Sequence, residues 1–328
     1  MSKIEKLESL VQKTALFDFP HHSRVHPLVS CDRAGIHAFV KREDEIGGLG
    51  GGAKVRKYLS LLPHLLNQNY EEAILIGSPF SNHILCFSGL LIQNKIKPVL
   101  FLYKTHTKKT GNYLWTSLLV PEENIHWIDK DNIDGSVQAY IKNHDKKIAV
   151  IPEGASMIES LTGALTLSFD ILRNEKESGL EFDHIIIDSG TGMMASALIL
   201  AFSYIEKKST VHVVQMGGNK EEFLSRLNKY KQDFEGLLKI SSMQALSYKL
   251  YFSETNRSFG SHSKELFANI IKLSRKEGFL TDPVFSGKLF MTGNEIVEKE
   301  NLKGNVLYIH SGGYSALTGY QDILEKLV

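Results

Sequence analysis

Residues 47–58 read Gly-Gly-Leu-Gly-Gly-Gly-Ala-Lys-Val-Arg-Lys-Tyr, so that five of the first six residues are glycine. Glycine weakens helices and strands through its backbone entropy, and glycines this dense favour a turn with positive φ or a close approach of the backbone to a ligand. A plain flexible surface loop is the alternative. A phosphate loop of the Walker type requires Gly-Lys-Ser/Thr. Because Ala53 precedes Lys54 and Val55 follows it, the sequence excludes a nucleoside-triphosphate site of that type.

The glycine-rich stretch leads into a segment with helical periodicity. Residues 55–66 are apolar on one face, which places Lys54 at or near the start of a helix. Pro63 has no backbone N–H and should kink or end this helix. On the other side, residues 36–40 have the pattern of a strand that runs through a polar loop into the glycines.

Strand and helix patterns alternate along the rest of the chain. Strands are predicted at residues 73–76, 99–103, 126–128, 148–151, 184–188, 211–215 and 306–310, and helices at residues 3–13, 84–91, 113–119, 137–143, 161–172, 193–204, 266–274 and 317–328. Such alternation predicts an α/β fold with mostly parallel, twisted sheets covered by helices. Because a second series begins near residue 161, we expect two open sheets.

The composition favours small metabolites as partners. Lys and Arg total 38 against 37 Asp and Glu, so no overall charge attracts nucleic acid or an anionic membrane. The amino terminus has no apolar signal core, and no apolar run approaches the ~18 residues that span a bilayer, which predicts a cytoplasmic protein. Cys31 and Cys86 are too few for a disulfide framework or a four-ligand zinc site, and we expect two buried free thiols and no metal centre.

Polar residues follow three of the predicted strands, at the edge where open α/β sheets bind ligands. Ser81-Asn82-His83 come after residues 73–76 and open a helix. They are good amino-terminal caps, and the same free amides and helix dipole can bind a carboxylate or a phenolic oxygen. Ser311, followed by two glycines, comes after residues 306–310. It suits either a turn or a hydroxyl aimed at a bound ring.

The third strand end, at residues 189–195, matches the pattern G-x-G-x-x-A. A dinucleotide site would need an acidic residue at the end of the next strand, but that strand ends in Gln215. A phosphate site for a smaller cofactor is therefore favoured over a dinucleotide site. A tight turn that packs the helix on the strand is the structural alternative.

Five ordered blocks together carry a resemblance to a known family. They are residues 51–57, 81–83, 189–192, 282–288 and 310–313, which read GGAKVRK, SNH, SGTG, DPVFSGK and HSGG. In order and spacing they resemble the aminocyclopropane-carboxylate deaminase and D-cysteine desulfhydrase family, from about residue 15 to residue 320. The resemblance implies pyridoxal-phosphate enzymes of fold type II, with the cofactor between two domains, and a homodimer. We expect residues 1–56 and 161–328 to form a large cofactor-binding domain and residues 57–160 a smaller α/β domain.

The resemblance also implies a role for each matched residue. Lys54 would form the Schiff base with the cofactor aldehyde and, once displaced by substrate, would move the α-proton. Ser81 would hold the substrate carboxylate, with His83 beside it. The cofactor's other contacts would be Asn82 at the ring hydroxyl, Gly190, Thr191 and Gly192 at the phosphate, and Ser311 at the pyridine nitrogen, with Ser286 as the competing candidate.

The substrate pocket departs from the family pattern. Phe80 stands in place of a glutamine, Phe259 and Phe285 each in place of a tyrosine, and Ser286 where the ring-opening deaminase has a glutamate. Phenylalanine keeps the ring volume but has no proton to give, so cyclopropane opening loses support. We therefore predict α,β-elimination from a small amino acid, giving a 2-oxo acid and ammonia, of the D-cysteine desulfhydrase type. The alternatives are aminocyclopropane-carboxylate deamination and a homologue that binds the cofactor without catalysis.

Overall fold

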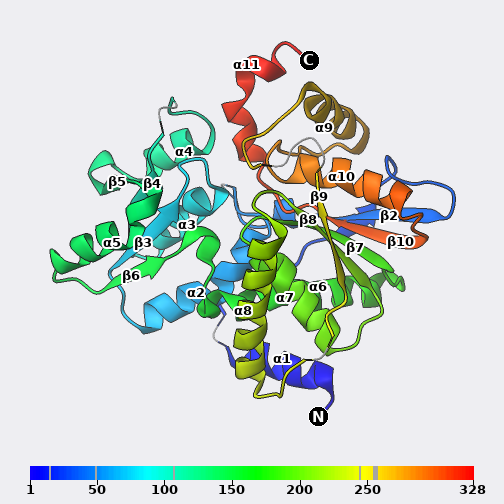
Figure 1. The fold of residues 1–328 in the computed structure, drawn as a ribbon, viewed down its shortest axis with the longest axis horizontal. Coiled ribbons are helices and arrows are strands. Elements are labelled where there is room, and N and C mark those ends of the chain that lie inside the picture. Colours follow the sequence, from blue (N-terminus) through cyan, green and yellow to red (C-terminus); the bar gives the residue numbers. More distant parts are fainter. Residues whose placement is uncertain (15, 49, 106–107, 244, 254–257) are drawn as a thin grey trace.

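The strands form two separate sheets (Figure 1) in the computed structural model, which describes residues 1–14, 16–48, 50–105, 108–243, 245–253 and 258–328. The six-stranded sheet has the order β1-β2-β10-β7-β8-β9, formed by Val25–Pro27, Ile36–Lys41, Gly304–Ile309, His184–Ser189, Thr210–Gln215 and Tyr248–Phe252. The four-stranded sheet has the order β5-β4-β3-β6, formed by Ile125–Ile128, Lys97–Tyr103, Glu72–Gly77 and Ile148–Ile151. Every pair except β1 with β2 is parallel, which confirms the predicted fold class.

Helices cover both faces of each sheet, because the central strands are apolar on both faces. Alternate residues of β7 separate two cores: Ile185 and Ile187 pack with α6, α7 and α8, whereas Ile186 packs with α9 and α10. The helices are α1 Lys3–Lys13, α2 Lys54–Asn67, α3 Asn82–Gln93, α4 Gly111–Leu119, α5 Ile133–Lys142, α6 Leu161–Ser178, α7 Met193–Tyr204, α8 Lys220–Leu238, α9 Lys264–Glu277, α10 Ser286–Lys299 and α11 Gln321–Leu324. The periodicity analysis missed α8, α10, β1 and β9.

Two predicted helices differ from the structure. The segment 317–328 is not one helix, because it consists of a 3₁₀ turn over Tyr314–Gly319 and the short α11. Gly319 packs close to the backbone of Gly111 in α4 and ends the turn there. The second difference concerns Pro63, since α2 continues through it to Asn67. The carbonyl of Leu59, which Pro63 cannot bind, accepts a hydrogen bond from the backbone N–H of Phe17 at 2.7 Å.

Helix α2 touches both halves of the molecule. Its apolar face, with Val55, Tyr58 and Leu62, packs in the core of the four-stranded sheet. Its other face packs on α6, where the hydroxyl of Ser60 accepts a 2.9 Å hydrogen bond from the amide of Gly163. All strands of the smaller sheet come from residues 72–151, while the domain boundaries at residues 56 and 160 stay a prediction.

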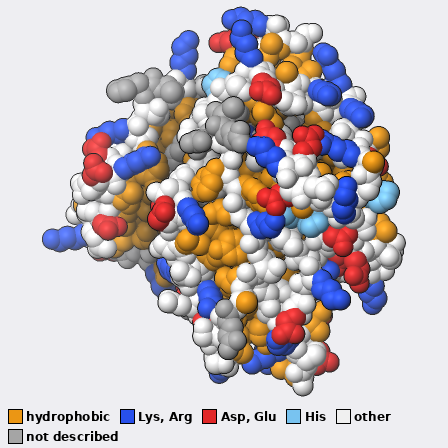
Figure 2. All heavy atoms as spheres, turned by 45° about the vertical axis from the view of Figure 1, so that its right-hand side comes forward, with side chains coloured by type: hydrophobic (Ala, Val, Ile, Leu, Met, Phe, Trp, Pro, Cys, Tyr) orange, Lys and Arg blue, Asp and Glu red, His pale blue; other side chains and the backbone are white. Residues whose placement is uncertain are grey.

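The surface shows no large region of one charge on the face drawn in Figure 2, where basic and acidic side chains are interspersed. This agrees with the formal net charge of +1. Both Cys31 and Cys86 are buried and free, as predicted. Among the described residues, no helix is long and apolar enough to cross a membrane.

A buried ion cluster joins α2 to the six-stranded half. Arg56 donates to Glu43 at 2.5 Å and to Asp170 at 2.7 Å, and Lys41 donates to Asp170 at 2.6 Å. Burial alone would raise the pKa of Asp170, but the cations of Lys41 and Arg56 outweigh it and hold that pKa well below its usual range. The same balance, with Arg56 as the main cation, lowers the pKa of Glu43. Each buried charge therefore depends on its partners.

We expect Arg56→Met to lower the free energy of unfolding by about 3–5 kcal/mol, because it leaves the buried Glu43 without its main cation and removes one of the two cations that pair with Asp170. Arg24→Met is the matched control, since the exposed pair of Arg24 with Glu45 should contribute about 1 kcal/mol or less. Urea unfolding at neutral pH measures both. Equal losses in the two variants would contradict the assigned role of the cluster.

The pH dependence has a definite sign. The folded-state pKa values of Asp170 and Glu43 lie below their unfolded values, so the cluster stabilises the fold above about pH 4. This contribution is lost as the pH falls further. The difference in unfolding free energy between the wild type and Arg56→Met should therefore shrink in acid.

Candidate active site

The predicted site residues gather around one cavity of about 280 Å³, at the carboxyl ends of strands from both sheets. Its lining includes Lys54, Phe80, Ser81, Asn82, His83, Gly190, Thr191, Gly192, Phe259, Phe285 and Ser311. These residues follow β3, β7 and β10 or lie in the loops beside them, as expected for an open α/β sheet. Ser286 is the exception, because it is not among the described residues that line the cavity.

The glycine-rich turn packs closely on the backbone that follows β10, and this packing fixes the position of Lys54. Gly52 has φ +56°, and a Cβ on it would lie 2.1 Å from the carbonyl oxygen of Ser311. The amide of Ala53 donates to that same carbonyl at 3.1 Å, and α2 then begins at Lys54. The prediction of a turn with positive φ is confirmed, while the alternative of a close approach to a ligand stays a prediction. The close partner shown by the structure is the backbone after β10.

Two lysines of α2 face the cavity one helical turn apart. The ammonium of Lys54 lies 4.7 Å from the ring centroid of Phe285. Lys57, 4% exposed, donates to the carbonyl of Gly154. Burial, together with the charge of Lys54, lowers the pKa of Lys57 to about 7. Two amines in one cavity, that of Lys57 buried and that of Lys54 half-buried, favour an anionic ligand. The sequence analysis did not single out Lys57, although its spacing of three from Lys54 places both on one helix face.

The start of α3 presents oriented donors. The hydroxyl of Ser81 caps the helix by accepting a 3.1 Å hydrogen bond from the amide of His83. The amide oxygen of Asn82 accepts a 2.7 Å hydrogen bond from Asn112, which leaves the Asn82 NH₂ group available to a ligand. Asn112 is held in turn by the hydroxyl of Ser315, at 2.8 Å. No sequence pattern pointed to Asn112, because it comes from α4.

His83 is neutral, and one nitrogen of its ring has no hydrogen-bond partner among the described residues. Its Nδ1 lies 2.7 Å from the hydroxyl of Tyr58, and its buried Nε2 has no partner among the described residues. Burial, aided by the charges of Lys57 and Lys54, lowers the pKa of His83 well below 6.5. If Tyr58 donates to Nδ1, the proton of His83 lies on Nε2, which is then a donor available to a ligand.

The loop after β7 forms a cradle at the start of α7. Gly192 has φ +93°, and a Cβ on Gly154 would lie 2.5 Å from the hydroxyl of Thr191. Because the carbonyl of Gly154 binds Lys57, the lysine amine lies beside this loop. The side chain of Gln215 stabilises this loop by donating a hydrogen bond to the carbonyl of Gly190 at 3.3 Å. Helix-terminal amides with an adjacent amine form an anion site.

Ser311 and Ser286, the two serines predicted as candidates to contact the pyridine nitrogen of the cofactor, have different surroundings. Ser311 lines the cavity, and its buried hydroxyl lies beside the carboxyl of Asp188. The hydroxyl of Ser286 instead donates to Asp282 at 2.7 Å and accepts from the Asp282 amide at 2.9 Å, at the start of α10. Beside Ser311 lies Asp188, which the sequence analysis missed. The sequence signal that could have pointed to Asp188 is a carboxyl directly after three isoleucines, near the end of a strand.

An aromatic wall closes the cavity. Phe259 and Phe285 lie with their ring centroids 5.7 Å apart, and Phe80 lines the cavity from the α3 side. Tyr320, just before α11, is the one tyrosine among the described lining residues. It was not predicted, because it comes from the carboxyl-terminal segment that was expected to be a plain helix. Burial raises the pKa of Tyr320, so it stays a phenol at neutral pH.

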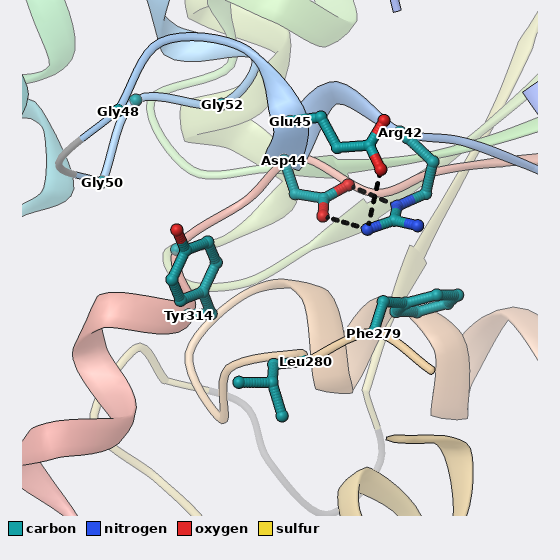
Figure 3. Close-up of a pocket in the computed structure, with 11 residues that line it drawn as sticks. Arg42, Asp44, Glu45, Gly48, Gly50, Gly52, Phe279, Leu280 and Tyr314 are labelled. Carbon is teal, nitrogen blue, oxygen red and sulfur yellow. Dashed lines mark hydrogen bonds and ion pairs between the residues drawn. The ribbon is translucent and has the colours of Figure 1, made fainter. Parts of the chain in front are cut away.

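A second cavity, of about 360 Å³, lies along the glycine-rich turn (Figure 3). It is lined by Gly48 and Gly50 to Gly52, together with Arg42, Asp44, Glu45, Phe279, Leu280, Gly313 and Tyr314. The guanidinium of Arg42 lies 4.7 Å from the ring centroid of Phe279 and is paired with Asp44 at 2.7 Å. None of the predicted site residues lines this cavity. The turn thus contributes to two cavities, with Lys54 in the first.

Comparisons with known proteins agree with this arrangement. The family described as "Pyridoxal-phosphate dependent enzyme" matches residues 20–312. A 1-aminocyclopropane-1-carboxylate deaminase of Rhizobium radiobacter is 26% identical over 87% of this chain and 89% of its own. A protein of Pyrococcus abyssi, provisionally named for the same activity, is 27% identical over 99% of both chains.

Solved structures show the same fold. The crystal structure of an ACC deaminase homologue has a TM-score of 0.85, with 25% identity, over 98% of this chain and 99% of that chain. Threonine deaminase isoform 2 from Solanum lycopersicum has a TM-score of 0.68, with 15% identity, over 98% and 93%. The second likeness concerns the fold alone.

The cavity has a group suited to each polar part of pyridoxal phosphate. Three lining residues bury a polar atom that has no partner among the described residues, namely His83 Nε2, Asp188 Oδ1 and Ser189 Oγ. Buried polar atoms are normally hydrogen-bonded, so three of them around one cavity indicate a polar ligand. The loop at residues 190–192 and Lys57 suit a phosphate, and the Lys54 amine suits an aldehyde. The residues present therefore fit this cofactor.

We expect Gly52→Ala to disrupt the site, because a Cβ would collide with the Ser311 carbonyl at a φ that L-residues rarely adopt. The strained backbone alone costs about 1–3 kcal/mol in unfolding free energy. Gly48→Ala is the matched control, since a Cβ there meets nothing within 4 Å and should change stability by about 0.5 kcal/mol or less. Denaturant unfolding and cofactor titration measure both variants. A Gly52→Ala protein as stable as Gly48→Ala would contradict the proposed contact.

Proposed function

Because the chain belongs to the family of pyridoxal-phosphate dependent enzymes, we propose that it deaminates a small amino acid to a 2-oxo acid and ammonia. The observation that supports this most is that residues lining the same cavity as Lys54 bury polar atoms that have no partner in the described part of the chain. Bound pyridoxal phosphate supplies an electron sink for negative charge at the α-carbon of an amino acid. The chain must supply the remaining functions: binding, orientation and proton transfer.

We assign a role to each residue from its position around the cavity. Lys54 holds the cofactor covalently through its Nζ and, when free, takes the α-proton of the substrate. Ser81 and the free amides at the start of α3 bind the substrate carboxylate, where the helix dipole favours negative charge. Asn82, oriented by Asn112, donates to the ring hydroxyl. The amides of the loop at residues 190–192 and the amine of Lys57 hold the phosphate.

The names of the relatives make 1-aminocyclopropane-1-carboxylate the first candidate substrate. Relatives that cover nearly the whole chain carry that name, and the ACC deaminase homologue has the most similar fold of the structures compared above. Ring opening of this substrate must protonate a carbon atom. Tyr320 is the phenol among the described lining residues that could supply this proton.

A second candidate, elimination from D-cysteine, is favoured by one specific observation. Phe259 and Phe285 stand together in the wall and carry no hydroxyl, so the wall they form offers no acid. Departure of a β-thiol needs less acid assistance than opening a carbon ring. The predicted homodimer and cytoplasmic location are part of this proposal and are tested by sedimentation and by cell fractionation.

We expect purified protein to absorb visible light when it holds the cofactor, and Lys54→Ala to lose that absorbance. Lys54→Arg is the matched control for charge, because it keeps a cation but cannot form the covalent link. Release of 2-oxo acid from 1-aminocyclopropane-1-carboxylate, D-cysteine, L-cysteine and D-serine then ranks the candidates. Cofactor binding with no turnover of any substrate would favour a homologue that binds the cofactor without catalysis. A wild type that takes up no pyridoxal phosphate would contradict the proposal as a whole.

We expect the cofactor-free protein to bind sulfate, used as a phosphate mimic of constant charge, more weakly as the pH rises from about 6 to 8. Lys57 has a pKa of about 7 and loses its positive charge over this range. Lys57→Met should remove both the pH dependence and about 1.5–3 kcal/mol of anion-binding free energy. Lys57→Arg keeps a charge at every pH and should show flat, tight binding. Calorimetric titration tests all three, and an unchanged pH profile in Lys57→Met would rule out this role.

A further inference from the structure

Asp188 is a buried carboxyl that the proposed roles leave unused. It lies at the carboxyl end of β7, is 9% exposed and lines the cavity. Its Oδ1 is buried and has no hydrogen-bond partner among the described residues. Glu153, the other carboxyl in the lining, is exposed. A carboxyl nine-tenths buried and facing a ligand cavity needs a positively charged or donating partner.

The surroundings of Asp188 show where that partner must come from. Burial raises its pKa, and Asp282 adds repulsion, while the ammonium of Lys54 and the hydroxyl of Ser311 favour the ionised form. Lys54 is the cation that most favours the charged carboxyl. When the Lys54 amine is bound covalently to the cofactor, it is no longer a free ammonium that can move to the carboxyl, and a donor on the cofactor itself can then pair with Asp188.

The strand order places Asp188 beside the residue implied to meet the pyridine nitrogen. Strands β7 and β10 are parallel neighbours, so their carboxyl ends, with Asp188 and Ser311, lie side by side. Residues alternate along β7, so Asp188 lies on the Ile186 face, towards Asp282 before α10. Ser189 lies on the opposite face, towards the anion cradle. The two buried side chains therefore serve different parts of the cavity.

We propose that Asp188 is the acidic partner of the cofactor's ring nitrogen and keeps that nitrogen protonated, with the Ser311 hydroxyl beside it. This assignment rests on the proposed function, because it needs bound pyridoxal phosphate. The carboxylate accepts the hydrogen bond from the ring N–H, and the proton comes from water as the cofactor binds. No bond within the protein forms or breaks.

The assignment changes the expected chemistry of the site. With Ser311 alone, the ring would face a neutral hydroxyl and withdraw electrons less strongly. A carboxylate that maintains the ring N–H makes the cofactor a stronger electron sink and prolongs the life of negative charge at the α-carbon. The substrate class that benefits consists of amino acids whose departing group is a poor one, such as carbon.

The test uses holoenzyme reconstituted with pyridoxal phosphate that carries an isotope label at the ring nitrogen, observed by nuclear magnetic resonance. The wild type should show a protonated ring nitrogen at neutral pH. Asp188→Asn, which keeps the shape but not the charge, should move the resonance to the unprotonated position. Glu153→Gln is the matched control for the other carboxyl of the cavity and should leave the resonance unchanged. Ser311→Ala should stay protonated, because Asp188 remains.

Three results would overturn the assignment. They are an unprotonated nitrogen in the wild type, a protonated one in Asp188→Asn, and loss of the proton in Ser311→Ala. The wild-type measurement keeps the test decisive even where a variant does not fold. If the wild type binds labelled cofactor but fails this test, only the role of Asp188 is wrong. If it binds no pyridoxal phosphate, the proposed function fails with it.

Discussion

The contact between the glycine-rich turn and the end of β10 is the constraint on which the site depends. The backbone of Gly52 and Ala53 meets the carbonyl of Ser311 so closely that no side chain fits between them. This one contact sets the start of α2, and therefore the position of Lys54, relative to the six-stranded sheet. The buried pairing of Arg56 with Glu43 and Asp170 holds the next residues of the helix to the same half. The reactive amine is thus placed by backbone packing and by ion pairs on either side of it.

The electrostatics of the cavity explain why an anionic, polar cofactor belongs there. Lys54 and Lys57 bring two amines into a largely buried space, and Asp188 is the one buried carboxyl among the described lining residues. The pKa of Lys57, lowered to about 7 mainly by burial, reflects a charge that has a carbonyl but no anion as its partner. A phosphate beside Lys57 would supply that anion. In the proposed arrangement the same phosphate also accepts from the amides of the cradle.

The sequence predicted those parts of the site that depend on short stretches. The glycine turn, the capping Ser81 and the cradle at residues 189–192 each follow from local backbone chemistry. Ser81 and the cradle line the cavity, and the turn leads into it at Ala53 and Lys54. Lys57, Asn112, Asp188 and Tyr320 were missed because their roles depend on which distant element packs beside them. For the same reason the competition between Ser311 and Ser286 could not be decided from sequence. Only the fold shows that Asp282 occupies the hydroxyl of Ser286.

The missing phenols of Phe259 and Phe285 carry less weight once the cavity is seen as a whole. The sequence argument against ring opening assumed that proton donors come from the two positions where the family has tyrosine. The cavity instead receives a phenol from Tyr320, which enters from the carboxyl-terminal segment. Reaction specificity would then depend on where this phenol lies relative to the substrate carbon, and the motif residues alone do not give that position. The departures from the family pattern are therefore compatible with a phenol supplied from a different segment of the chain.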